Sequence, residues 1–160
     1  MPSGFRSILS MRFMLDTMIF DHIVADPVLA EMVRETVGSG RITIVTTHVQ
    51  EDQIAAIPDE RKRRAISCLP RRTVPTMGFV LDVSRLGMAR LADDDTNTAI
   101  ESIGRQHLLT VKDALIAASV RGEADALVTE DKTLRKRIRR DGLNVTLLGF
   151  EEFREYVTSS

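Results

Sequence analysis

Cysteine, tryptophan and long apolar runs are scarce or absent in this sequence. Its 160 residues include one cysteine, which excludes an internal disulfide and a four-cysteine zinc site. There is no tryptophan, and aromatic residues make up 4% of the chain, so stacking on flat ligands such as bases can contribute little. No apolar run reaches the roughly 18 residues of a membrane-spanning helix, and no secretory signal is recognisable at the start. We therefore expect a cytoplasmic protein with no membrane association.

Neither positive nor negative charge is in large excess. Lys and Arg number 22, Asp and Glu number 23, and the formal net charge is -1. Bulk charge therefore indicates neither a nucleic-acid nor a membrane partner, and such affinity has to come from local clusters. A chain that is 43% hydrophobic and 28% charged has the composition of a globular protein of about one domain. We expect residues 1–10, which carry no periodic pattern, to form a flexible extension and residues 11–160 to form a single domain.

Apolar patterning predicts strands and helices that alternate along the chain. Strands are predicted over 12–15, 42–46, 78–83, 126–129 and 144–148. Helices are predicted over 17–25, 27–37, 49–57, 60–66, 96–104, 111–121, 132–140 and 151–157, with a loop over 70–75. Strands separated by one or two helices need crossover connections, which are typical of a mostly parallel sheet covered on both faces. The sequence therefore predicts an α/β fold.

Acidic residues follow predicted strands, or open a predicted helix, at four places: Asp16, Glu51, Asp113 and Asp131. Taken singly, each is explained by a helix N-cap or a solvated helix face. In an open parallel sheet, however, side chains at the carboxyl ends of the strands converge on one crevice, where several carboxylates repel one another unless a cation neutralises them. Oxygen ligands suit Mg²⁺ or Mn²⁺ better than Zn²⁺. The pattern therefore indicates a divalent-cation site.

Other catalytic arrangements find less support in the sequence. The three histidines form no His-Glu-x-x-His motif, so we expect surface or structural roles for them. The segment 38–40 lacks the lysine and the spacing of a phosphate-binding loop, which disfavours nucleotide binding. Cys68 lies in an apolar helical stretch, so core packing is predicted for it rather than nucleophilic catalysis. A haloacid-dehalogenase-like phosphatase is disfavoured because Met18 stands where that class has a second Asp.

Four short phrases contain these acids and occur in a characteristic order: Phe13-Met14-Leu15-Asp16-Thr17, Val49-Gln50-Glu51, Asp113-Ala114-Leu115-Ile116-Ala117-Ala118 and Ala126-Leu127-Val128-Thr129-Glu130-Asp131. Together they resemble the PIN domain family over about residues 11–150. The Asp-Ala-Leu-Ile-Ala-Ala phrase followed by Leu-Val-Thr-x-Asp is the most specific part of the resemblance. The resemblance implies a three-layer α/β/α sandwich with a mostly parallel central sheet.

PIN-like proteins include many Mg²⁺- or Mn²⁺-dependent ribonucleases, among them the toxin half of VapBC toxin–antitoxin pairs. The resemblance implies that the family's four acidic positions are Asp16, Glu51, Asp113 and Asp131, with Thr17 and Thr129 as small polar residues beside the first and last. It implies metal-assisted hydrolysis of RNA phosphodiester bonds, with Asp16 and Asp113 as the principal ligands. Glu51 and Asp131 would hold a second ion, directly or through water, or orient the attacking water. An antitoxin protein and a homodimer are further implied partners.

Cations for RNA phosphates are present in two clusters. One cluster, over 135–140, begins four residues after Asp131, so Arg135, Lys136 and Arg139 are predicted to touch a strand bound at the acids. The other cluster, over 61–64 and 71–72, is predicted to lie on a solvated helix face. The alternative to a ribonuclease is a PIN-like module that binds RNA or a protein without cleaving. The presence of all four acids argues against this alternative.

Overall fold

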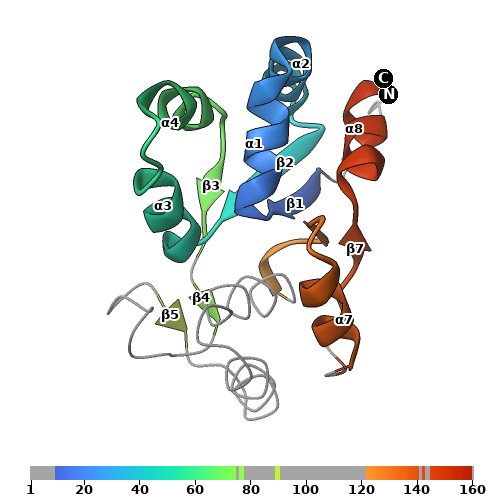
Figure 1. Cartoon of the computed structure of the whole chain (residues 1–160). Helices are drawn as coiled ribbons and strands as arrows, with labels where there is room; N and C mark the ends of the chain where they lie inside the picture. Colours follow the sequence, from blue (N-terminus) through green and yellow to red (C-terminus); the bar gives the residue numbers. More distant parts are fainter. Residues whose placement is uncertain are drawn as a thin grey trace, which may run out of the picture.

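A computed structural model of the chain describes residues 10–74, 76–77, 89–90, 122–140, 142 and 145–159. Within them, five strands form one sheet in which every neighbouring pair is parallel (Figure 1). In spatial order these strands are β3 (Arg72–Thr73), β2 (Ile42–Thr46), β1 (Met11–Leu15), β6 (Ala126–Val128) and β7 (Leu147–Leu148). The predicted α/β fold with a parallel sheet is therefore confirmed, and β1, which Asp16 follows, is the central strand.

The sheet is buried on both of its faces. Alternate residues of a strand project to opposite sides. One face contributes apolar side chains of β1, β2 and β6 to the main core, namely Phe13, Leu15, Ile42, Ile44, Ala126 and Val128. The opposite face carries Met14, Val45 and Leu127, whose side chains are also fully buried. Burial on both sides is what a parallel sheet with helices on each face requires.

Six helices are described around this sheet: α1 (Thr17–Ala25), α2 (Pro27–Gly38), α3 (His48–Ala55), α4 (Glu60–Ser67), α7 (Lys132–Arg140) and α8 (Phe150–Thr158). The bounds of α1 and α7 are those predicted, and the other helices differ from prediction by one or two residues at their ends. Asp26 and Asp59 cap α2 and α4 through their side chains, and Thr47 forms a capping box with Gln50 at the start of α3. No helix within the described ranges combines the length and the apolar character needed to cross a bilayer.

The segment after α4 differs from the prediction. The loop predicted over 70–75 contains β3, which pairs with the end of β2, and the Val74 N–H donates to the Thr46 carbonyl at 2.7 Å. Two further strands, β4 (Thr76–Met77) and β5 (Ala89–Arg90), form a separate parallel pair. The predicted extension up to residue 9, the strand over 78–83 and the helices over 96–104 and 111–121 lie outside the described residues.

The prediction that Cys68 packs in the core is wrong. This residue is the C-cap of α4, and its side chain is exposed. Ile66 and Leu69, which lie on either side of it in the sequence, are buried instead and belong to the hydrophobic core. Cys68 therefore takes no part in the core that the sequence pattern assigned to it.

Candidate acidic site at the strand ends

Asp16 lies directly after the central strand, at the carboxyl edge of the sheet. Its N–H donates to the Val128 carbonyl at 2.9 Å, which continues the pairing of β1 with β6 by one residue. Asp16 is 8% exposed and occupies the N-cap position of α1, but its side chain makes no regular capping hydrogen bond. Helix capping therefore does not account for a carboxylate buried at this position.

Thr129 connects Asp16 to Asp131. The Thr129 hydroxyl donates to Asp16 Oδ2 at 2.8 Å and accepts the N–H of Asp131 at 3.1 Å. Thr129 is fully buried and follows β6, the strand that pairs with β1. The structure thus brings Asp16 and Asp131 to the same edge of the sheet, with a buried hydroxyl that fixes one oxygen of Asp16.

Electrostatics at this edge disfavour negative charge. Burial raises the pKa of Asp16 above its ordinary value, and the charge of Asp131 raises it further. The hydrogen bond from Thr129 and the backbone amides of Thr17 and Met18 offset part of this rise. A bound divalent cation would relieve the desolvation and the repulsion together, and carboxylate oxygens are the donors that Mg²⁺ and Mn²⁺ prefer. Asp16 and Asp131 therefore fit such an ion chemically.

Asp131 has a structural role beside its position in the acidic pair. Its Oδ1 accepts the N–H groups of Thr133 and Leu134, each at 2.9 Å, at the start of α7. The helix-cap interpretation of Asp131 is therefore confirmed, and the hydrogen bond from its N–H to Thr129 also places it beside Asp16. Its Oδ2 accepts no hydrogen bond from the residues that the structure describes, so capping occupies one of its two oxygens.

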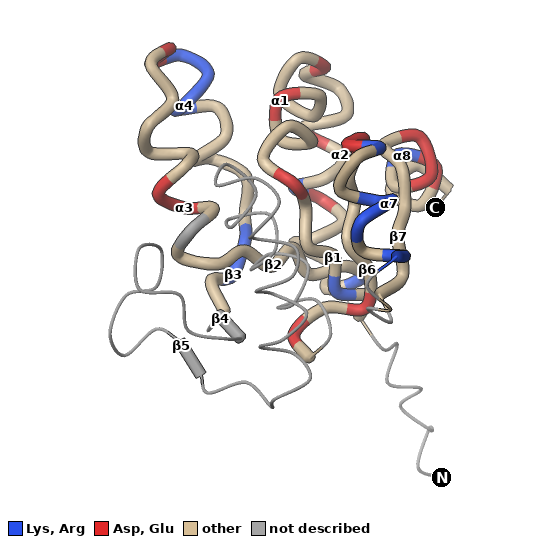
Figure 2. The backbone as a smooth tube through the Cα atoms, turned by 60° about the horizontal axis from the view of Figure 1, so that its bottom comes forward, with Lys and Arg blue, Asp and Glu red and all other residues tan. Residues whose placement is uncertain are grey.

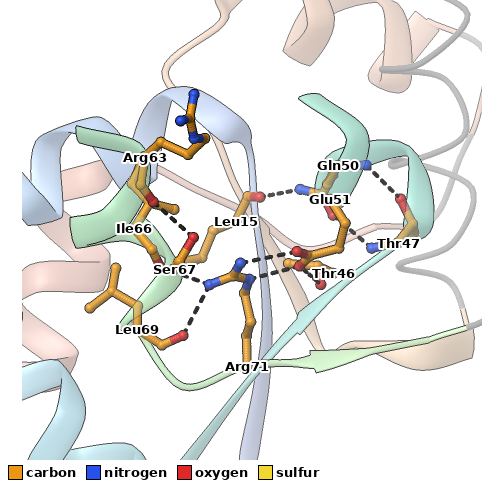
Figure 3. A network of polar contacts seen from close by, with 10 residues as sticks. All are labelled: Leu15, Thr46, Thr47, Gln50, Glu51, Arg63, Ile66, Ser67, Leu69 and Arg71. Carbon is orange, nitrogen blue, oxygen red and sulfur yellow. Dashed lines mark hydrogen bonds and ion pairs between the residues drawn. The ribbon is translucent and has the colours of Figure 1, made fainter. Parts of the chain in front are cut away.

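Glu51 is bound to an arginine (Figure 3). The Arg71 Nε and Nη2 atoms lie 2.7 and 3.0 Å from Glu51 Oε1 and Oε2, and the Thr46 hydroxyl donates to Oε1 at 2.7 Å. Burial pushes the pKa of Glu51 upward, but the contacts with Arg71 and Thr46 outweigh it and leave the pKa below its ordinary value. Both oxygens of this predicted ligand are thus engaged by a cation of the protein itself.

Two other residues predicted for the site are Thr17 and Asp113. Thr17 donates its hydroxyl to Gln53 Oε1 at 2.7 Å and so joins α1 to α3. Asp113 lies outside the described residues. In the ranges that are described, no group of three or more His, Cys, Asp or Glu side chains could hold a metal ion.

Two residues at this edge, Gln50 and Arg71, make contacts that were not predicted from the sequence. Gln50 is fully buried; its Nε2 donates to the Leu15 carbonyl, and its Oε1 accepts the Thr47 N–H at 3.1 Å. The Thr-x-x-Gln pattern could have indicated the capping box but not the bond to β1. The prediction that Arg71 lies on a solvated face is wrong, since its side chain is 12% exposed. No local pattern marks this residue, because its partner lies 20 residues away in the sequence.

Helix α7, which starts directly after Asp131, is rich in Lys and Arg (blue in Figure 2). Leu134 and Ile138 are buried, whereas Lys136 and Arg139 are exposed on the other side of the helix. Arg135 is half-buried, and its Nε atom makes no hydrogen bond within the part of the chain that the structure describes. The three cations predicted to contact RNA thus lie on one helix that begins beside the acidic pair.

No protein-family model and no curated protein sequence matches this chain. Among solved structures, it is similar to a chain in the crystal structure of VapBC2 from Rickettsia felis bound to a DNA fragment from their promoter. The two chains are 14% identical, the match covers 87% of this chain and 98% of the other, and the TM-score is 0.45. Functional conclusions therefore have to come from the side chains described above.

Proposed function

We propose that this chain is a PIN-like ribonuclease that depends on Mg²⁺ or Mn²⁺. The observation that carries the proposal is the Asp16–Thr129–Asp131 arrangement, which brings two carboxylates from adjacent strand ends to one edge. Asp16 is a buried acid with a raised pKa beside a second acid, and a bound cation would offset both the burial and the repulsion. Asp113 is the third ligand in this proposal, and this assignment rests only on the sequence resemblance to the PIN domain family.

The residues at this edge have different roles in the proposed reaction. The ion would be held by Asp16, Asp113 and Asp131, and it would supply polarisation of the phosphate and a water of lowered pKa. Thr129 orients Asp16 by donating its hydroxyl to Oδ2. The exposed cations of α7 hold the RNA backbone near these acids.

Metal dependence of cleavage tests the proposal. Labelled single-stranded RNA is incubated with the full chain, with the chain plus EDTA, and after excess Mn²⁺ is restored. We expect cleavage with Mn²⁺, none with EDTA, and recovery on restoring the metal. Asp16→Asn purified in parallel reports any contaminating nuclease. Cleavage that persists in EDTA would contradict metal dependence.

Charge reversal on α7 tests the predicted RNA contacts. Lys136→Glu combined with Arg139→Glu changes two exposed cations and leaves the buried Leu134 and Ile138 in place. We expect RNA binding to weaken by about tenfold at moderate salt, and the slope of log affinity against log salt to fall by about two. The measurement is a filter-binding titration at several salt concentrations, using a non-cleaving variant.

The matched control reverses two cations elsewhere. Arg34→Glu with Arg41→Glu changes the net charge equally, but Arg34 lies on α2 and Arg41 precedes the amino end of β2. The control should leave the salt slope unchanged. Equal effects of the two double variants would mean that net charge alone determines RNA binding, and α7 would then lose its assigned role.

A second candidate is a PIN-like module that binds RNA or a protein without cleaving. The specific observation in its favour is the ion pair between Glu51 and Arg71, which engages one of the four predicted acids. A folded, metal-loaded chain that binds RNA with a salt-dependent affinity but cuts none would support it. The antitoxin partner, the homodimer and the cytoplasmic location remain predictions from the sequence.

A further inference from the structure

We infer that Glu51 is a positioning residue that fixes Arg71 and the corner between α3, α4 and β3, and that it is not a ligand of the catalytic ion. The inference rests on the proposed function, since it concerns the ion held at Asp16 and Asp131. It removes one acid from the set that the family resemblance implies.

Arg71 uses all three nitrogens of its guanidinium in the corner (Figure 3). Nε and Nη2 donate to Glu51, while Nη1 donates to the Ile66 carbonyl at 2.7 Å and to the Leu69 carbonyl at 3.1 Å. The guanidinium also lies 5.8 Å from the centre of the Phe20 ring on α1. A bidentate pair with these additional bonds is held in one geometry, unlike a solvated surface pair.

The surroundings of Glu51 are positively charged. Two hollows of about 330 and 270 Å³ flank its pair with Arg71. Arg63 and Arg64 line the second hollow together with Arg71, and among the described residues Glu51 is the one acid that lines either hollow. A divalent cation bound to Glu51 would lie close to Arg71 and near Arg63, whereas Arg64 is paired with Glu60 on α4. Like charges at such distances oppose one another, so this position disfavours an ion.

The side of α3 that meets the end of β1 carries neutral amides. Gln50 donates to the carbonyl of Leu15, and Gln53 accepts the hydroxyl of Thr17, so the residues on both sides of Asp16 are bonded to this helix. Residues three apart lie on the same side of a helix, whereas Glu51 is turned about 100° from Gln50. Glu51 therefore contacts the β2–β3 side, and amides contact the chain around Asp16.

The pair with Arg71 also explains why Glu51 would resist being drawn toward an ion. Moving its carboxylate away would leave Arg71, which is 12% exposed, without an acidic partner among the described residues. An unpaired charge at a largely buried position is strongly destabilising. Glu51 thus acts on the acidic edge indirectly, by keeping α3 and β3 in place beside β2.

A metal-binding titration combined with a stability cycle tests this inference on the full chain. Mn²⁺ binding is measured by calorimetry for the parent chain, Glu51→Gln and Asp16→Asn, at a temperature where all three are folded. We expect Glu51→Gln to keep its Mn²⁺ affinity within about twofold, whereas Asp16→Asn loses at least about tenfold. Glu51→Gln should lower Tm by about 5–10 °C, and adding Arg71→Met should restore most of that loss because the unpaired cation is then absent.

Glu60→Gln is the matched control, since Glu60 pairs with Arg64 on the exposed surface of α4 and should change neither quantity. A loss of Mn²⁺ affinity in Glu51→Gln as large as in Asp16→Asn would overturn the inference. Additive losses of Tm in Glu51→Gln and Arg71→Met would overturn it as well, since the two residues would then not act as a pair. If the parent chain binds no Mn²⁺, the proposed function fails, and the stability cycle alone decides whether Glu51 positions Arg71.

Discussion

Asp16→Asn is expected to lower metal-dependent RNA cleavage by about a thousandfold or more and to raise Tm at pH 7. The asparagine keeps the shape of the side chain and can still accept the Thr129 hydroxyl. It lacks the negative charge that would bind a divalent cation. This substitution should therefore lower the cleavage activity while raising Tm, which separates the role of Asp16 in the reaction from its effect on stability.

The sign of the stability change follows from the raised pKa of Asp16. The folded chain holds a proton on this carboxyl at a pH where the unfolded chain has already released it. The free energy of unfolding therefore falls as the pH rises from the ordinary carboxyl pKa through the raised one. At a pH above the raised pKa the full penalty of a buried charge is present, and Asp16→Asn removes it. The gain in Tm should shrink as the pH is lowered through the raised pKa, because the wild-type side chain is then neutral too.

Thermal unfolding from about pH 4, near the ordinary carboxyl pKa, to about pH 8, and RNA cleavage at about pH 7, are the two measurements. Asp26→Asn is the control, because Asp26 is also at a helix N-cap and asparagine caps equally well. It should leave activity and Tm unchanged. A stabilised but fully active Asp16→Asn would remove Asp16 from the reaction. A destabilised and inactive one would mean that Asp16 mainly supports the fold.

The parts of this molecule that sequence could predict are those decided by local chemistry. Asp26, Thr47 and Asp59 mark helix starts because a cap bonds to amides two or three residues away. Asp16 and Asp131 could be placed together because parallel strands deliver their carboxyl ends to one edge. The order of those strands did not have to be known for this step.

The parts that could not be predicted depend on contacts between distant segments. Glu51 follows the same strand-end rule as Asp16, yet its partner Arg71 reaches it because β3 pairs with the end of β2. That short strand lies in a segment with the composition of a loop. The prediction for Cys68 fails for a related reason. The residues around it are apolar, but α4 ends at this position and the Cys68 side chain is exposed. A prediction of site chemistry from spacing alone thus finds the edge but not which acids are already neutralised.

Thr129→Val is expected to lower cleavage by about 10- to 100-fold and to shift its dependence on pH. Valine fills the same volume, but it can neither donate to Asp16 nor accept the N–H of Asp131. The Thr129 hydrogen bond lowers the pKa of Asp16, so its removal lets that pKa rise further. Because the reaction needs the ionised carboxylate, the acidic limb of the pH–rate profile should move to higher pH. The free energy of unfolding should fall by about 1–3 kcal/mol, since the buried carboxylate of Asp16 and the partly buried N–H of Asp131 each lose a partner.

Two further variants separate positioning of Asp16 from loss of stability. Thr129→Ser retains the hydroxyl and should recover the parent pH profile, even if the missing methyl group costs some stability. Thr36→Val removes the hydroxyl of another buried threonine, which donates to the Met32 carbonyl within α2, far from the acids in the sequence. It should leave the pH profile unchanged. If Thr36→Val and Thr129→Val reduce cleavage equally, lowered stability explains both, and the hydroxyl of Thr129 has no part in setting the charge of Asp16. A shifted acidic limb in Thr129→Val alone would tie the rate to the ionisation of Asp16, which metal dependence by itself does not establish.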